Sequence, residues 1–149
     1  MLDKNGIEMK TGMIVQISGA YFKNDNGTYY IDRSPGDAGW NGKDYSLKKI
    51  SKSGKISTAK YSLAFWPLVS YVSDQRKTAA ANDHNRKHAT IEVISIPNMS
   101  EVKAHFQKEA NEASESIRDY ERRFHWDGNT LALYQAMQAH YQAVADSIG

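Results

Sequence analysis

The chain has 149 residues, the size of one domain, and its 40% hydrophobic and 24% charged content is ordinary for a soluble globular protein. It has no cysteine, which excludes disulfides, thiolate catalysis and cysteine-based zinc sites. No apolar run approaches the ~18 residues that span a bilayer, and residues 1–10 lack the apolar stretch of a signal peptide. We therefore expect a cytoplasmic protein with no membrane partner.

The small net charge of +2 conceals a strong asymmetry along the chain. Residues 41–90 hold ten Lys and Arg against three Asp and Glu, whereas residues 91–149 hold five against nine. The acidic C-terminal third could neutralise the basic middle within the fold, or the basic surface could stay free for an anionic partner. The composition leaves both arrangements open.

The N-terminal part of the chain predicts short β-strands joined by turns. Residues 13–17 are an apolar, β-branched run, and residues 24–27 are a turn sequence because Asn and Gly tolerate positive φ. We expect a hairpin about this turn, with Tyr21 and Phe22 in one strand and residues 28–31 in the other. A second hairpin turn is expected at Ser53 and Gly54. Further strands are expected at residues 45–50, 56–61 and 63–66, the last with Phe65 and Trp66 in the core.

The second half of the chain predicts helices and one more strand. Residues 74–85 have helical composition with Ser73 as the N-cap, and residues 89–96 alternate as a strand that returns to the sheet. Two amphipathic helices follow, the first capped by Ser100, with a break at residues 127–129. Their apolar stripes contain Val102, Phe106, Ala110, Ala113, Ile117, Tyr120 and Phe124, then Leu131, Tyr134, Met137 or Gln138, Tyr141, Ala145 and Ile148.

These elements predict an α+β fold. Its first part, residues 1–97, is expected to be a small antiparallel β-barrel or sheet of the SH3-like or OB-like kind, with one inserted helix near residues 74–85. Its second part, residues 98–149, is expected to be an antiparallel helical hairpin. The hairpin either packs on the β domain or serves for association, including a homodimer through its helices.

No complete catalytic or metal-binding motif is present. His84 and His88 have the spacing of a metal pair on one helical face, but no recognised third ligand accompanies them. His88 and Thr90 resemble one half of the two-histidine phosphoesterase motif, and the second half is missing. Lys55 follows a glycine but lacks the glycine pattern of a phosphate-binding P-loop. We therefore expect a non-enzymatic protein with no cofactor and no metal.

Basic and aromatic residues are interleaved between residues 40 and 71, a mixture that suits phosphate contacts and base stacking. Lone lysines on strands usually only solvate a sheet edge, but five lie within residues 48–60. A Gly- and Pro-rich loop precedes them, and loops carried on a rigid sheet are common binding sites. The predicted binding residues are Arg33, Asp37, Trp40, Lys43, Tyr45, Lys48, Lys49, Lys52, Lys55 and Lys60.

Two stretches resemble known families. The opening KTGMIVQISGAYFKNDNGTYYI resembles the start of KOW-type and other SH3-like barrels. The run AYFKNDNGTYYI…SPGDAGWNGKDYSLKKI…GKIS…KYSLAFWPL, residues 20–68, resembles small uncharacterised accessory proteins of phages and mobile elements of gut-type bacteria. That resemblance implies an accessory protein that handles DNA or blocks a host defence system. It brings no catalytic residues to map onto this chain.

Three hypotheses follow. The first is a non-catalytic protein that binds nucleic acid, or a nucleic-acid-handling protein, through a basic and aromatic face of the β domain. The second is a phage or mobile-element inhibitor of a host defence protein, anti-CRISPR-like, that acts by protein–protein contact. The third is a small-ligand binder at the loop of residues 33–40.

Overall fold

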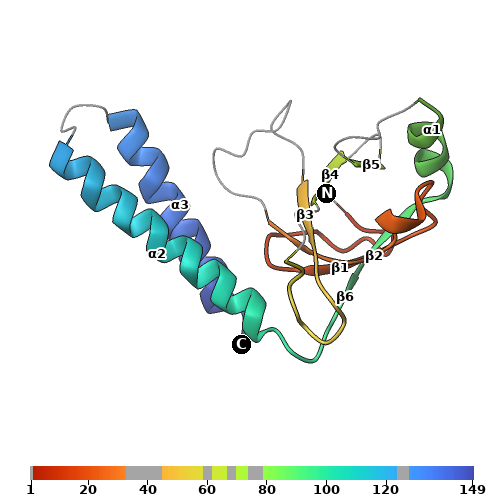
Figure 1. Cartoon of the computed structure of the whole chain (residues 1–149), viewed down its shortest axis with the longest axis horizontal. Helices are drawn as coiled ribbons and strands as arrows, with labels where there is room; N and C mark the ends of the chain where they lie inside the picture. The colour runs from red at the N-terminus through yellow and green to blue at the C-terminus, as the bar shows by residue number, and fades with distance from the viewer. Residues whose placement is uncertain (1, 33–44, 59–61, 67–69, 74–78, 124–127) are drawn as a thin grey trace.

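The computed structural model describes residues 2–32, 45–58, 62–66, 70–73, 79–123 and 128–149 (Figure 1). Its described strands form one six-stranded antiparallel sheet in the order β5-β4-β3-β2-β1-β6. They are β1 (Ile14–Ser18), β2 (Gly27–Ile31), β3 (Tyr45–Lys49), β4 (Ser62–Trp66), β5 (Ser70–Ser73) and β6 (Thr90–Ile94). The predicted α+β class with an antiparallel sheet is confirmed. Of the two predicted forms, barrel or sheet, the described strands make the open sheet.

The central strands β1 and β2 carry buried side chains on both faces of the sheet. Successive side chains of a strand point to opposite sides, so each strand contributes to two apolar clusters. Val15 and Tyr29 are register partners on one face, where they pack with Leu47. Ile14 and Tyr30 are partners on the other face, which carries a second apolar cluster. The continuous apolar runs of β1 and β2 reflect this burial on two sides.

The second cluster is formed between the sheet and two long helices, α2 (Ser100–Arg123) and α3 (Gly128–Ser147). The helices lie side by side in Figure 1 and run in opposite directions, since Gln107 bonds Gln142 while Tyr120 contacts Tyr134. The predicted stripe residues of α2, Val102, Phe106 and Ala110, are fully buried. In α3, Ala145 is fully buried, and Tyr141 and Ile148 are nearly so. Burial of these stripes holds α2 against the sheet and α3 against α2.

The first predicted hairpin needs a correction. Its second strand is as expected, but its first strand is β1, which pairs with β2, and the predicted turn residues 24–27 run from the connecting loop into β2. Tyr21 and Phe22 instead belong to the connecting loop, which contains a short 3-10 helix, η1 (Lys23–Asp25). The backbone N–H of Tyr21 donates to Oδ1 of Asn85, 2.9 Å away, so that donor goes to a side chain rather than to a strand ladder.

The inserted helix also differs in its limits. Helix α1 (Ala79–His88) continues to His88, beyond the expected end near residue 85, and Ser73 closes strand β5. Residues 74–78 are outside the described residues. The turn at Ser53 and Gly54 and the strand beginning at Tyr45 are confirmed. No described helix has the length and apolarity required to cross a bilayer.

Candidate nucleic-acid interface

A tight hairpin of residues 48–58, here called the basic hairpin, carries all four of the described lysines that the sequence predicted as a site. Ile50 pairs with Ile56 across its base. The N–H of Ser51 donates to the carbonyl oxygen of Lys55 at 2.9 Å. The N–H of Gly54 donates to the carbonyl oxygen of Ser51, also at 2.9 Å. Gly54 has a φ of 90°, which glycine adopts readily and other residues rarely do. The turn therefore places Lys52 and Lys55 at an exposed tip.

The basic hairpin is fixed against the start of α2. Gly54 is buried, and a Cβ atom there would overlap the carbonyl oxygen of Asn98. The N–H of Ile56 donates to Oε1 of Glu101 at 3.3 Å, and Ile50 is buried among the residues that α2 covers. The lysines at the tip are thus carried by a supported turn.

The tip combines cations with hydroxyl groups. Lys52, Lys55, Ser51 and Ser53 are all exposed. The Oγ atoms of the two serines are 2.8 Å apart, and that of Ser51 also accepts from the N–H of Lys55 at 3.0 Å. Ammonium and hydroxyl groups are the usual donors to phosphate oxygens. The serines were not predicted as site residues, although their alternation with lysine in SKSGK was visible in the sequence.

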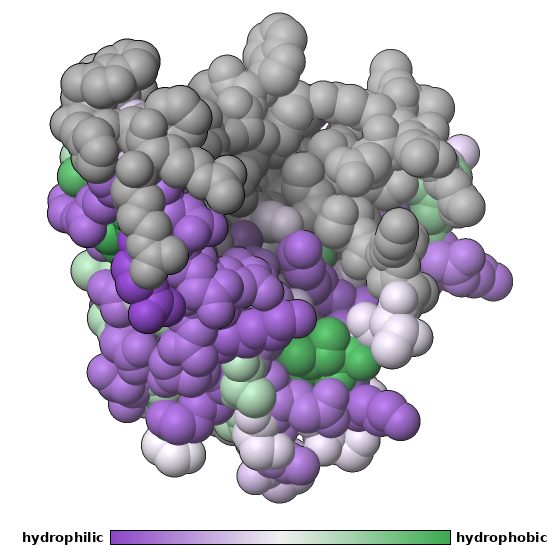
Figure 2. Space-filling view, turned by 60° about the vertical axis from the view of Figure 1, so that its left-hand side comes forward, coloured by the Kyte–Doolittle hydropathy of each residue, from purple (hydrophilic) through white to green (hydrophobic). Residues whose placement is uncertain are grey.

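The acids of the chain do not neutralise this tip in the part of the chain that the structure describes. Lys48, Lys52 and Lys55 form no ion pair with a described carboxylate, and Glu101 reaches the hairpin only through the backbone of Ile56. The outer side of α2 carries exposed acids such as Glu112, and the face that bears α2 and α3 is largely hydrophilic (Figure 2). The lysines of the hairpin tip are therefore not paired with the described acids of the C-terminal third.

The predicted lysines do not share one face of the sheet. Lys48 pairs with Tyr30 and lies on the side that α2 covers, whereas Lys49 pairs with Tyr29 and lies on the opposite side. The Nζ atom of Lys49 donates to the carbonyl of Asn24 at 2.8 Å and lies 5.7 Å from the centroid of the Tyr29 ring. Lys49 is thus occupied within the fold.

The other predicted residues are not brought into this site by the described structure. Tyr45 begins β3 and pairs with Phe65 by its backbone, but its side chain is outside the described residues. The same holds for all of Arg33, Asp37, Trp40, Lys43 and Lys60. The predicted small-ligand loop of residues 33–40 therefore stays a prediction.

A polar cluster joins α2 to the end of β2. Nε2 of His105 lies 3.4 Å from Oδ2 of Asp32, and the His105 ring meets the Tyr30 ring edge-on at 5.4 Å. Burial, together with the charges of Asp32 and Glu109, raises the pKa of Tyr30 to about 12. Within the described ranges, no three His, Cys, Asp or Glu residues gather so that they could hold a metal ion.

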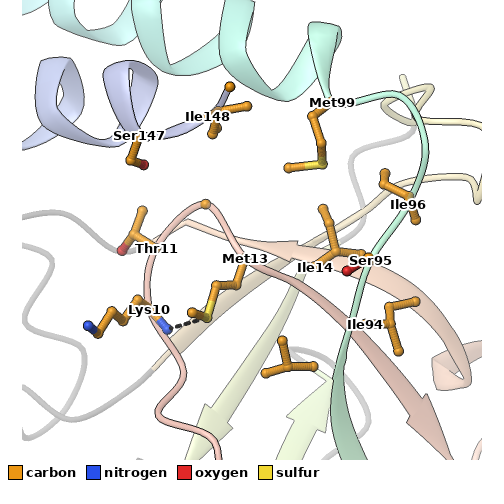
Figure 3. A pocket seen from close by; sticks show the side chains of 13 residues that line it. Lys10, Thr11, Met13, Ile14, Ile94, Ser95, Ile96, Met99, Ser147 and Ile148 are labelled. Carbon is orange, nitrogen blue, oxygen red and sulfur yellow. Dashed lines mark hydrogen bonds between the residues drawn. The ribbon is translucent and has the colours of Figure 1, made fainter.

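A separate groove of about 550 Å³ lies where the loop before β1, the end of β6 and the end of α3 meet (Figure 3). Met13 and Ile14 face Met99 and Ile148 across it. None of Lys48, Lys49, Lys52 or Lys55 belongs to its lining. The groove is mainly apolar and is unrelated to the basic hairpin.

Comparisons of the chain with models of protein families, with curated proteins and with solved structures found no match.

Proposed function

We propose that this protein binds nucleic acid and that the basic hairpin makes its phosphate contacts. The observation that carries the proposal is the exposure of Lys52 and Lys55 at a supported turn, with no described carboxylate paired to either. Phosphate contacts from lysine supply most of the sequence-independent affinity for nucleic acid. The exposed hydroxyls of Ser51 and Ser53 add neutral donors to the same tip.

The test is fluorescence anisotropy with a mixed pool of labelled oligonucleotides. Replacing both Lys52 and Lys55 by Ala should weaken binding roughly tenfold, which is about 1.4 kcal/mol. The matched control replaces Lys4 and Lys108 by Ala, which removes the same charge from lysines that are paired with Glu92 and Glu112. The control should retain nearly all of the affinity. Equal losses in the two double variants would contradict a role specific to the hairpin.

The alternative, an anti-CRISPR-like inhibitor that contacts a host defence protein, predicts a different result. The wild-type chain would then bind no oligonucleotide, and a pull-down from nuclease-treated host lysate would still retain a protein partner. The exposed acids of α2, such as Glu112 and Glu115, would suit a basic surface on that partner.

Two finer structural hypotheses accompany the proposal. The in-order pairing of consecutive strands from β1 to β5 supports an SH3-like or OB-like relationship for the β domain. The antiparallel contacts of α2 and α3 support the description of residues 98–149 as a helical hairpin. Sedimentation velocity at several concentrations tests whether these helices also mediate a homodimer.

A further inference from the structure

A second surface lies in the loop of residues 19–26, here called the Tyr21 loop. The Tyr21 side chain is 47% exposed. Its ring meets Phe22 at 5.0 Å with an interplanar angle of 87°, and His84 at 5.6 Å with an angle of 69°. Neither contact is a parallel stack, so neither neighbour occupies the ring in the way that a stacked base would.

The Tyr21 loop is held in place by side-chain hydrogen bonds to its backbone. Asn85, buried on α1, accepts from the N–H of Tyr21 at 2.9 Å, and Asn26 accepts from the N–H of Ala20 at 2.8 Å. A ring nitrogen of His84 lies 3.1 Å from the carbonyl of Gly19. An exposed aromatic ring on a fixed backbone loses little conformational entropy when a ligand binds. That preorganisation distinguishes Tyr21 from an ordinary exposed apolar side chain.

Exposed cationic residues flank this loop and its anchor along the chain. Lys23 is exposed in η1, two residues after Tyr21, and Arg86 is exposed on α1, next in sequence to Asn85. Lys49 connects the Tyr21 loop to the basic hairpin through its hydrogen bond to Asn24. Aromatic rings beside lysine and arginine form the usual surface for single-stranded nucleic acid.

We propose that Tyr21 stacks on an unpaired base and that the preferred ligand is a single-stranded nucleic acid. The inference rests on the proposed nucleic-acid function and adds the ligand's class. In a duplex both faces of a base are covered by its neighbours, so a protein ring gains a stacking partner only where the strand is unpaired. The basic hairpin supplies phosphate contacts, and the Tyr21 loop supplies a base contact.

The test compares one labelled single strand with its duplex, using the wild type, Tyr21→Ala and Tyr21→Phe. The single strand should bind the wild type more tightly than the duplex does. Tyr21→Ala should weaken single-strand binding about tenfold and leave its salt dependence unchanged, while Tyr21→Phe keeps the ring and the affinity. The hydrogen bond to Asn85 comes from the backbone, so both variants retain the anchor. Leu133→Ala removes a comparably exposed apolar side chain from α3 and should have no effect.

Two results would overturn the inference and leave the proposed function standing. The first is that Tyr21→Ala binds the single strand as tightly as the wild type does. The second is that the wild type binds the single strand and the duplex equally well. Absence of any binding by the wild type would overturn the proposed function itself and the inference with it.

Discussion

The Nζ atom of Lys49 donates a hydrogen bond of 2.8 Å to the carbonyl oxygen of Asn24, and this contact joins the basic hairpin to the Tyr21 loop. The two residues are far apart in sequence and belong to different turns. The contact assigns Lys49 a structural role, whereas Lys52 and Lys55 lie exposed at the hairpin tip.

Replacing Lys49 by Met should lower the free energy of unfolding by about 1 kcal/mol, because a charge-assisted hydrogen bond and a contact with the Tyr29 ring are lost. Urea denaturation followed by circular dichroism measures the change. Lys55→Met alters an exposed lysine of the same hairpin and should stay within about 0.5 kcal/mol of the wild type. Indistinguishable stabilities of the two variants would contradict the structural role of Lys49.

Gly54→Ala should destabilise the protein more than Gly6→Ala does. Both glycines have positive φ, 90° and 82°, so alanine costs roughly 1–2 kcal/mol at either position. At Gly54 the new Cβ also overlaps the carbonyl oxygen of Asn98, whereas at Gly6 it meets no atom within 4 Å. Urea denaturation measures the unfolding free energy of each variant, and the additional loss in Gly54→Ala over Gly6→Ala is the cost of the overlap with Asn98. Equal losses would mean that the hairpin does not pack closely on the residues before α2.

Phe106→Ala should cost about 3–5 kcal/mol, the usual effect of removing a fully buried aromatic side chain. Phe106 contacts Tyr30 of the sheet edge-on and Tyr141 of α3 in a stacked arrangement, each at 6.1 Å between ring centroids. Its loss therefore weakens both the helix–sheet and the helix–helix contacts. Calorimetry should give a much lower Tm for this variant, while the exposed Leu133→Ala changes it little. A small effect of Phe106→Ala would show that α2 does not depend on this core.

Stability should fall as the pH rises above 10. Burial raises the pKa of Tyr30 to about 12, and burial likewise raises the pKa of Tyr29 above its usual value. These tyrosines ionise more readily in the unfolded chain, so their contribution is complete below pH 10 and is lost as the pH approaches 12. Urea denaturation at pH 9 and pH 11 measures the loss. Tyr30→Phe should reduce the pH dependence, and an unchanged dependence would contradict the burial of this hydroxyl.

Local sequence patterns predicted much of the fold. The steps of three and four from Val102 to Phe106 and Ala110 identified the buried stripe of α2, because helical periodicity does not depend on distant residues. The positive φ of Gly54 likewise follows from a local turn signal. Successive side chains of a strand alternate between its two faces, so Lys48 and Lys49 had to lie on opposite faces of β3. The predicted binding residues nevertheless placed both lysines in one site.

Long-range contacts determined what the sequence did not predict. Tyr21 looked like a strand residue because it is aromatic, but its N–H is taken by Asn85 from a helix much later in the chain. The support of the basic hairpin by Asn98 and Glu101 is equally non-local. No local sequence pattern indicates that Asn85 would bind the backbone of Tyr21, or that Asn98 and Glu101 would support the basic hairpin.

The most direct test of phosphate binding by the basic hairpin is the salt dependence of single-strand affinity. We predict that log Kobs of the wild type falls linearly with log salt concentration, because bound lysines displace counterions. Replacing Lys52 and Lys55 by Ala should reduce the slope by about 1 for each lysine, while Tyr21→Ala leaves it unchanged. No binding by the wild type at low salt, or the same slope in the wild type and the double lysine variant, would contradict the proposal.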